Sequence, residues 1–184
     1  LLYGATGGRL FVAGRVGERF AVRNSGATAV VEGVGKHGCE YMSGGTIVVL
    51  GPTGRNFGAG MSGGRAYVMD EFGDFEARLN PMLVESTPVD APGDLEELRA
   101  LIAEHLEKTG SDRAQRILQA WPHVATRFWK VAPRSLEVPL PSAIERRIRP
   151  DATRNTPTAT RSRRGKKANA PLTPPAPPTP SNDP

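Results

Sequence analysis

His37 and Cys39 are the residues of this 184-residue sequence whose side chains could do covalent chemistry together. Two residues apart on a strand, they would share a face, and the imidazole could take the thiol proton to create a nucleophile. A lone cysteine is more often a small buried residue than a nucleophile, and we expect neither a carboxylate nor an oxyanion donor beside the pair. We therefore predict a structural role for this pair and no catalytic residue in the chain.

Three glycines, Gly33, Gly35 and Gly38, match the spacing G-x-G-x-x-G after a strand-like run. A dinucleotide site of this type needs a helix that opens at the glycines, so that the helix N-terminus meets the pyrophosphate. Residues 39–45 do not have a helical pattern, and no strand–helix–strand unit surrounds them. We predict corner turns here and no cofactor-binding residue.

Metal and nucleic-acid sites receive equally little support from the sequence. The spacing of His105 and His123 relative to His37 does not make a metal site, and a single cysteine excludes an internal disulfide and a cysteine cluster. The one concentrated basic run, residues 161–167, lacks the interleaved aromatic residues that stack on bases. We predict no metal ligand, and a solvated tail rather than a nucleic-acid contact.

Charge is unevenly distributed along the chain. Residues 1–140 hold 15 basic and 16 acidic residues, whereas residues 141–184 hold 9 and 3. The basic balance therefore belongs to the end of the chain, and a polyanion-binding face on the first part is not favoured. We expect partial pairing within the glycine-rich part between Arg9, Arg15, Arg19, Arg23, Arg55 and Arg65 and the acidic Glu18, Glu32, Glu40, Asp70, Glu71 and Asp74.

A repeat of 18 or 19 residues must position all of these groups. Each copy opens on a glycine, carries one short run of β-branched or aromatic residues, and closes on another glycine. The opening glycines are Gly7, Gly26, Gly44 and Gly63, and the closing ones are Gly17, Gly35, Gly54 and Gly73. Short repeats predict stacked units that cannot bury their apolar faces alone.

The repeat predicts a parallel β-helix in which one copy makes one coil. The segment between the apolar runs is long enough for a second short strand and two turns, and Leu1–Tyr3 also resembles a strand. Because coil corners need positive φ and leave no room for side chains, we predict that the four opening glycines stack in one column.

The glycine rhythm ends after Gly73, and residues 74–93 are predicted to close the stack with Phe75, Leu79, Leu83 and Val84 on their underside. Residues 94–109 predict a helix that begins at an Asp94 N-cap with Glu97 in a capping box and stops at Gly110. A second helix, capped by Ser111 and kinked by Pro122, is expected to bury Ile117, Leu118, Trp121, Val124, Ala125, Phe128 and Trp129 against the flank of the coils.

Ten of the seventeen prolines lie in residues 141–184, which predicts a disordered tail. The expected domains are therefore a glycine-rich β-helix at 1–93, a helical extension at 94–140, and the tail at 141–184. The sequence has no run long enough to span a membrane and no signal peptide. A cytoplasmic protein is expected, and the opening residues suggest a piece of a longer polypeptide.

Several stretches of the repeat resemble one known family, over about residues 1–140. They are Gly4–Gly8, Gly17–Gly26, Gly38–Met42, Asn56–Met61 and Gly73–Phe75. These residues look like the C-terminal GXGXG domain of the glutamate synthase large subunit. The similarity continues weakly through His105, Thr109–Ser111 and Pro133.

The resemblance implies a right-handed β-helix within an oxidoreductase that makes glutamate from glutamine and 2-oxoglutarate during ammonia assimilation. It implies that FMN and an iron–sulfur cluster are bound elsewhere in that enzyme, with glutaminase and synthase domains as neighbours and a smaller NADPH/FAD-dependent subunit as electron donor. In that family this domain is a structural support, and no position here matches a catalytic residue.

Two other classes are kept beside this interpretation. The glycine-rich coil is also similar to a subunit of formylmethanofuran dehydrogenase, so a free-standing assembly or binding module is the alternative. An independent enzyme would need a pocket with convergent polar groups, and the sequence specifies none.

Overall fold

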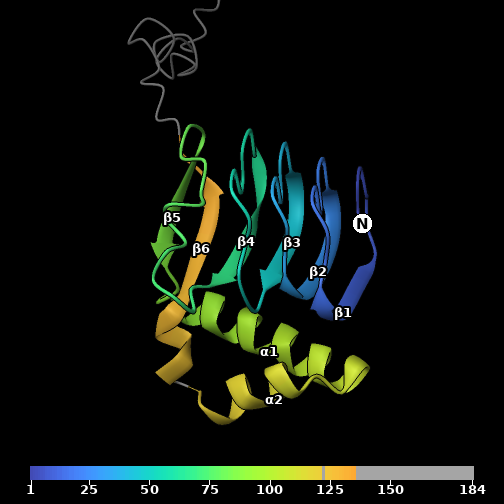
Figure 1. The fold of residues 1–184 in the computed structure, drawn as a ribbon, viewed down its shortest axis with the longest axis vertical. Helices are drawn as coiled ribbons and strands as arrows, with labels where there is room; N and C mark the ends of the chain where they lie inside the picture. Colours follow the sequence, from blue (N-terminus) through green and yellow to red (C-terminus); the bar gives the residue numbers. More distant parts are fainter. Residues whose placement is uncertain (122, 136–184) are drawn as a thin grey trace, which may run out of the picture. The chain divides into compact units, whose positions relative to one another are not determined.

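The computed structural model describes residues 1–121 and 123–135, and the tail predicted at 141–184 lies outside them. The described residues belong to one structural unit, Leu1–Glu137. Its centre is a six-stranded sheet with the order β1-β2-β3-β4-β6-β5, in which the first four strands are parallel (Figure 1). The strands are β1 (Arg9–Arg15), β2 (Ser25–Gly33), β3 (Ser43–Val49), β4 (Gly63–Met69), β5 (Val84–Pro88) and β6 (Phe128–Pro133).

The parallel strands align the repeat coil on coil, which confirms the predicted solenoid. Phe11 pairs with Val30, Val30 with Val48, and Val48 with Tyr67. β-branched and aromatic residues fit such a half-buried pleated surface. The period of 18 or 19 residues is therefore the length of one coil.

The return segment of each coil differs from the predicted second strand. It consists of turns in which alternate residues have positive φ: Arg19, Ala21 and Arg23 in one coil, then His37, Cys39 and Tyr41, then Asn56, Gly58 and Gly60. Backbone amides connect these turns to the coils on both sides, as when Cys39 N–H donates to Phe20 O and Tyr41 N–H donates to Ala59 O. We call this stack the turn ladder.

The chain start belongs to the same ladder and is not the strand expected at Leu1–Tyr3. Leu2 has a φ of 57°, and the Leu1 carbonyl accepts a hydrogen bond from Ala21 N–H. The opening coil therefore contributes turns, because its amides pair with a neighbouring turn and not with a strand.

The predicted glycine column is present with an offset. A Cβ on Gly44 would lie 2.3 Å from the Ser25 carbonyl oxygen, and one on Gly63 would lie 2.1 Å from that of Ser43. Each glycine stands over the residue before the previous opening glycine, since Ser25 pairs with Gly44 and Ser43 with Gly63. Close stacking explains these glycines. The positive φ expected of them occurs at the next residue in three of the four copies, at Gly8, Gly45 and Gly64.

The sheet separates two cores. Alternate strand residues point into the solenoid, where Ala29, Ile47 and Val49 pack with Phe20 and Phe57 from the return segments. The intervening residues, such as Val30, Val48 and Tyr67, face outward and pack under the helices. This alternation is the period-two pattern of a strand that is buried on both faces.

Helix α1 (Pro92–Thr109) crosses the sheet next to α2 (Asp112–Gln119), as Figure 1 shows. The predicted stop at Gly110, with a φ of 66°, and the Ser111 cap, which accepts from Ala114 N–H, are confirmed. The predicted Asp94 cap is wrong, because the N-cap is Ala91 and has no side-chain cap bond. Proline in the first turn, which needs no N–H there, marks the start instead.

The second helix is shorter than predicted. It ends at Gln119, a 3-10 helix follows at His123–Arg127, and Phe128 and Trp129 lie in strand β6 and not on a helix. This strand runs antiparallel between β4 and β5 and covers the edge of the parallel sheet. Edge coverage of this kind prevents further strand pairing at an open solenoid end.

The segment predicted to close the stack also forms part of this cap. Phe75 and Val84 are buried as expected, and Leu79 makes a parallel bridge to Phe57. Leu83 is 44% exposed and does not belong to the predicted apolar underside.

Candidate functional site

Cys39 is fully buried and faces the solenoid interior, whereas His37 is partly exposed on the turn ladder. The His37 ring nitrogen Nδ1 lies 2.6 Å from Glu40 Oε1, so the expectation that no carboxylate lies beside the pair is wrong. Burial raises the pKa of the Cys39 thiol strongly, so the thiolate is disfavoured at neutral pH. The geometry favours the structural role predicted for the pair over a nucleophile and its base.

We expect native Cys39 to resist alkylation. Iodoacetamide at neutral pH should leave the folded chain unlabelled and should label it fully in urea, because only unfolding exposes the thiol and restores its ordinary pKa. Intact-mass spectrometry over time measures both reactions. Rapid labelling of the folded chain would contradict the buried, protonated state.

The glycines of the G-x-G-x-x-G stretch make room for neighbouring coils. A Cβ on Gly35 would lie 2.8 Å from Glu18 N, and one on Gly38 would lie 3.0 Å from Phe57 Cδ2. Turns follow β2 at this point, and no helix opens there. The expected corner turns are present, without the helix N-terminus that would bind a pyrophosphate.

One group of charged side chains joins α1 to the sheet, and we call it the α1 seam. Tyr67 Oη lies 2.8 Å from Asp94 Oδ1 and 2.8 Å from Glu97 Oε2. Lys130 Nζ donates to both oxygens of Asp94 at 2.9 and 2.7 Å, and Arg65 lies 3.1 Å from Glu97. The phenol has one proton to share between two carboxylates, and each carboxylate has its own cation.

Electrostatics in the α1 seam favour charged carboxylates beside a neutral phenol. Burial and the two neighbouring carboxylates raise the pKa of Tyr67. Burial alone would raise the pKa of Asp94, but the hydrogen bonds from Lys130 and Tyr67, with the charges of Lys130 and Arg65, lower it on balance. The sequence interpretation took Asp94 and Glu97 for a helix cap and missed Tyr67 and Lys130, because their contact depends on strand β6.

A second polar contact lies further along α1. Ser111 Oγ donates to Glu32, and His105 Nε2 lies 3.6 Å from the same carboxylate. His105 is fully buried, and within the described residues neither ring nitrogen has a hydrogen-bond partner. Burial lowers the pKa of His105, and Glu32 offsets part of that effect. The ring therefore acts mainly as a neutral packing group beside Phe11, whose centroid is 6.1 Å away.

Acid should weaken the fold through His105. Its folded pKa is lowered, so the unfolded chain binds more protons as the pH drops from about 7 towards 5, and the free energy of unfolding should fall. Urea unfolding across this range measures the slope for the natural chain and for His105→Leu. The variant should show a shallower slope, and equal slopes would contradict this assignment.

Further pairs attach the helices to the sheet. Arg9 pairs with Glu104 of α1, and Arg113 of α2 donates to the Leu50 carbonyl at 2.9 Å and lies 3.2 Å from Glu71. The sequence suggested that the repeat arginines pair with acidic residues of the glycine-rich part. Arg9 and Arg65 instead pair with glutamates of α1. Partial pairing within the coils occurs at Lys36 and Glu18, 3.8 Å apart.

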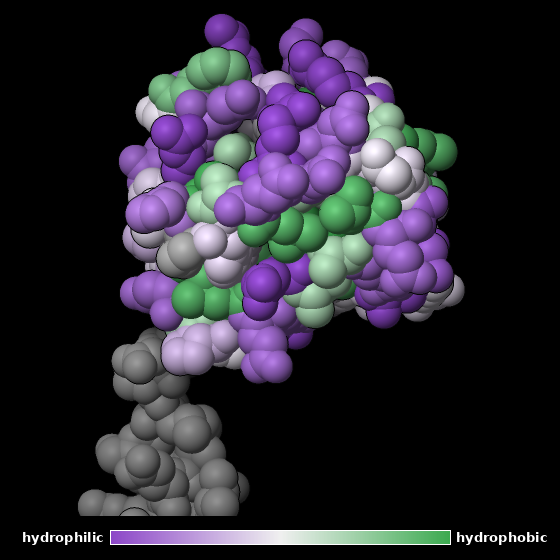
Figure 2. Space-filling view, turned by 90° about the horizontal axis from the view of Figure 1, so that it is seen from below, coloured by the Kyte–Doolittle hydropathy of each residue, from purple (hydrophilic) through white to green (hydrophobic). Residues whose placement is uncertain are grey.

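A shallow apolar groove of about 530 Å³ lies on the outer side of the two helices. Hydrophobic side chains gather on this face in Figure 2. The lining residues are Leu95, Glu96, Arg99, Ala100, Ala103, Leu118 and Trp121. They provide no convergent set of polar groups of the kind that orients a substrate.

Within residues 1–121 and 123–135, no cluster of three His, Cys, Asp or Glu side chains is placed to hold a metal ion. No helix in this part of the chain combines the length and apolar character needed to cross a membrane. Between the helices and the sheet the arrangement offers packing and ion pairing, and the titratable groups there are engaged in structural contacts.

Comparisons with known proteins agree with this fold. The family model described as "GXGXG motif" matches residues 1–134. Ferredoxin-dependent glutamate synthase 2 of Synechocystis sp. is 53% identical over 134 residues, which are 73% of this chain and 9% of that protein. Glutamate synthase (NADH) of Schizosaccharomyces pombe is 55% identical over 139 residues, 76% of this chain and 7% of that protein.

A third relative, ferredoxin-dependent glutamate synthase 2 of Arabidopsis thaliana, is described as chloroplastic and is 51% identical over 136 residues, or 74% of this chain. The chain spans less than a tenth of each of these relatives, with 8% of the length in this case. The resemblance drawn from the glycine repeat is confirmed, and the chain belongs to the GXGXG family of glutamate synthases.

Proposed function

We propose that this chain is the C-terminal scaffold region of a glutamate synthase, which supports the catalytic domains without contributing a catalytic residue. The main support is the turn ladder together with the parallel sheet. Both sides of each coil are hydrogen-bonded to the next coil, as from Val34 N–H to Pro52 O and from His37 N–H to Arg55 O. A stack fixed on two sides resists bending and can hold neighbouring domains at a constant separation.

The cofactors of the whole enzyme are assigned to other regions in this proposal. An iron–sulfur cluster takes several cysteine thiolates, and this chain has one cysteine, which is buried. FMN would need an anion site for its phosphate, and the glycine-rich turns use their amides within the ladder. A small electron-donating subunit, a cytoplasmic location and the 1–93, 94–140 and 141–184 domain division remain predictions.

The size of the natural polypeptide is the first test. An immunoblot of a cell extract against the repeat should give a band far above 19.7 kDa if these residues belong to the large enzyme. A band near 19.7 kDa would favour the alternative, a free-standing assembly module similar to the formylmethanofuran dehydrogenase type.

The scaffold role is tested in that intact enzyme. Gly63→Ala, which loosens the coil stack, should let glutamine hydrolysis continue while less glutamate forms per glutamine consumed, and Gly17→Ala, at an open position, should leave the ratio unchanged. The purified 184-residue chain should neither hydrolyse glutamine nor form glutamate from 2-oxoglutarate and ammonia. Activity in that chain, or an unchanged ratio in soluble Gly63→Ala enzyme whose solenoid has loosened, would overturn the proposal.

A further inference from the structure

The outer side of the turn ladder has the residue types of a protein interface. We call this surface the return face and define it by Tyr3, Arg19, Arg23, Lys36, Tyr41 and Arg55, all of them exposed. Tyr3 and Tyr41 are 61% and 60% exposed. Tyrosine and arginine are among the residues most enriched in the hot spots that dominate the binding energy of protein interfaces. Their concentration here therefore indicates a protein-binding surface.

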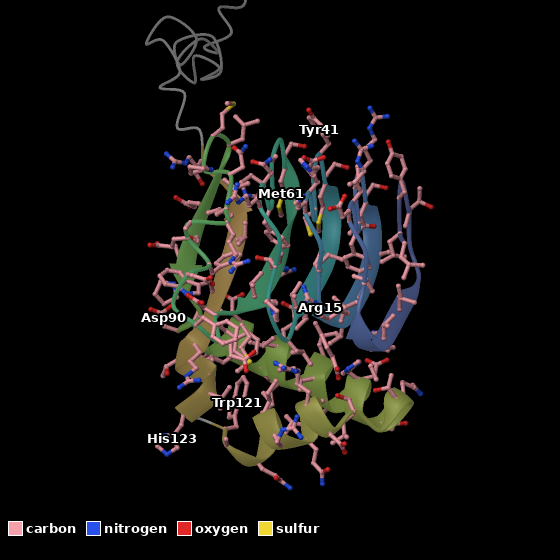
Figure 3. The ribbon with its side chains drawn as sticks, viewed as in Figure 1. Arg15, Tyr41, Met61, Asp90, Trp121 and His123 are labelled. Atoms are coloured by element: carbon pink, nitrogen blue, oxygen red, sulfur yellow. The ribbon has the colours of Figure 1, made fainter. Side chains whose placement is uncertain are left out.

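Backbone bonds bring these residues onto one surface. Arg19 N–H donates to the Lys36 carbonyl, and His37 N–H donates to that of Arg55, so the basic residues follow one another from coil to coil. Tyr41 lies one coil after Arg23 in the same position of the repeat. Figure 3 places Tyr41 at the end of the unit away from α1 and α2, where the helices do not cover it.

Positive charge on the return face is only partly neutralised within the described residues, since Lys36 has a glutamate neighbour and the three arginines have none. Arg19, Arg23 and Arg55 make no ion pair there, whereas Arg9 and Arg65, on the helix side, pair with glutamates of α1. The acidic neighbours of the return face are engaged locally: Glu18 lies 3.8 Å from Lys36, and Glu40 lies against His37. Three guanidinium groups are thus available for external carboxylates, which they bind in bidentate geometry.

The return face is also rigid before binding. Its backbone is tied at each rung of the turn ladder, and the Tyr41 ring rests on Gly60, where a Cβ would approach the ring to 2.5 Å. A preorganised surface loses little conformational entropy on association. A fixed backbone and a fixed Tyr41 ring therefore favour a protein contact over a solvated face.

We propose that the return face docks a carboxylate-rich protein surface that lies outside residues 1–134, in the rest of the same enzyme. The proposal rests on the proposed function and names the surface through which the scaffold holds its neighbour. Its occupant follows from charge complementarity and from length, since the chain spans only 7% to 9% of the relatives it matches.

Zero-length carbodiimide crosslinking of the intact enzyme tests this contact, because it joins a lysine to a carboxylate that touches it. Lys36 should crosslink to an aspartate or glutamate outside residues 1–134, as identified by mass spectrometry. Lys108 is a matched control: it is exposed on α1 and has its own glutamate neighbour, Glu107, at 3.5 Å. It should give only the local product. Lys36 crosslinked to Glu18 alone would overturn the proposal.

Charge-reversal variants provide the second part of the crosslinking test. Arg19→Glu/Arg23→Glu/Arg55→Glu should reduce the long-range Lys36 product at least tenfold, whereas reversal of the exposed Arg99, Arg116 and Arg127 should not change it. An equal loss of the long-range product in both triple variants would overturn the docking contact, as would an ultraviolet adduct at Tyr41 that nuclease removes.

Two results separate this proposal from the scaffold role. If the Lys36 crosslink is found but Gly63→Ala does not change the glutamate formed per glutamine consumed, the docking contact is supported and the scaffold role is contradicted. If that ratio falls in Gly63→Ala but Lys36 gives no long-range crosslink, the scaffold role is supported and the return face is not the docking surface.

Discussion

Gly63→Ala should destabilise the chain by about 3 kcal/mol, the upper end of the usual cost of overpacking. The new Cβ would lie 2.1 Å from the Ser43 carbonyl oxygen and 2.8 Å from the carbonyl carbon. Both are backbone atoms of the adjacent coil, so no side chain can rotate to relieve the clash. The φ of Gly63 is not in the left-handed region, and the cost is therefore steric.

Urea unfolding followed by circular dichroism measures this loss, with Gly17→Ala as the matched control. Gly17 is also a repeat glycine, but a Cβ there meets nothing within 4 Å and its φ is ordinary. The control should be neutral, or more stable by about 0.4–1 kcal/mol through the lower entropy of its unfolded chain. If both variants lose the same stability, the column of close backbone contacts is not what requires glycine.

The opening glycines show how far the sequence predicts this fold. Their spacing correctly predicts the length of a coil and the parallel register. It does not distinguish a glycine needed for space, such as Gly44, from one needed for positive φ, such as the adjacent Gly45 at 89°. That distinction depends on which carbonyl the neighbouring coil presents, and a one-residue offset between coils decides it.

The turn ladder and strand β6 could not be predicted from local pattern. Arg19, Ala21 and Cys39 adopt positive φ although such a conformation costs an L-residue roughly 1–2 kcal/mol. They adopt it because each turn hydrogen-bonds to the coils on both sides, which is a tertiary effect. Phe128 and Trp129 fit a helical apolar face equally well, and only antiparallel pairing with distant β4 and β5 makes them a strand.

In the candidate site, too, local features could be predicted from the sequence and tertiary contacts could not. The sequence favoured a small buried residue over a nucleophile at Cys39, since burial is the commonest state of a lone cysteine, and the side chain is buried in the folded chain. It misread Asp94 and Glu97 as a helix cap, because their partners Tyr67 and Lys130 come from strands that are distant in sequence. Long-range ion pairing has no local signature, so the α1 seam could only be found in the folded chain.

Phe57→Ala should cost about 3–5 kcal/mol, the range for removing a buried phenylalanine. The ring is fully buried, packs edge-on against Phe75 with centroids 5.7 Å apart, and occupies the space beside Gly38. Phe72 is the matched control, since it is 70% exposed and its replacement by alanine should stay within about 0.5 kcal/mol. Urea midpoints and slopes give both values.

A double variant at Gly38 and Phe57 tests the packing of this ring more strictly. A Cβ at Gly38 would lie 3.0 Å from Phe57 Cδ2 and 2.9 Å from Val34 Cγ1, so Gly38→Ala should destabilise the natural chain. With Phe57 already shortened, one of the two contacts disappears, and the double variant should be more stable than the sum of the single effects by about 1 kcal/mol. Strict additivity would mean that Gly38 does not make room for the ring. Coupling would identify the last glycine of the dinucleotide-like motif as a packing residue, because a glycine that bound a cofactor would have no reason to depend on Phe57.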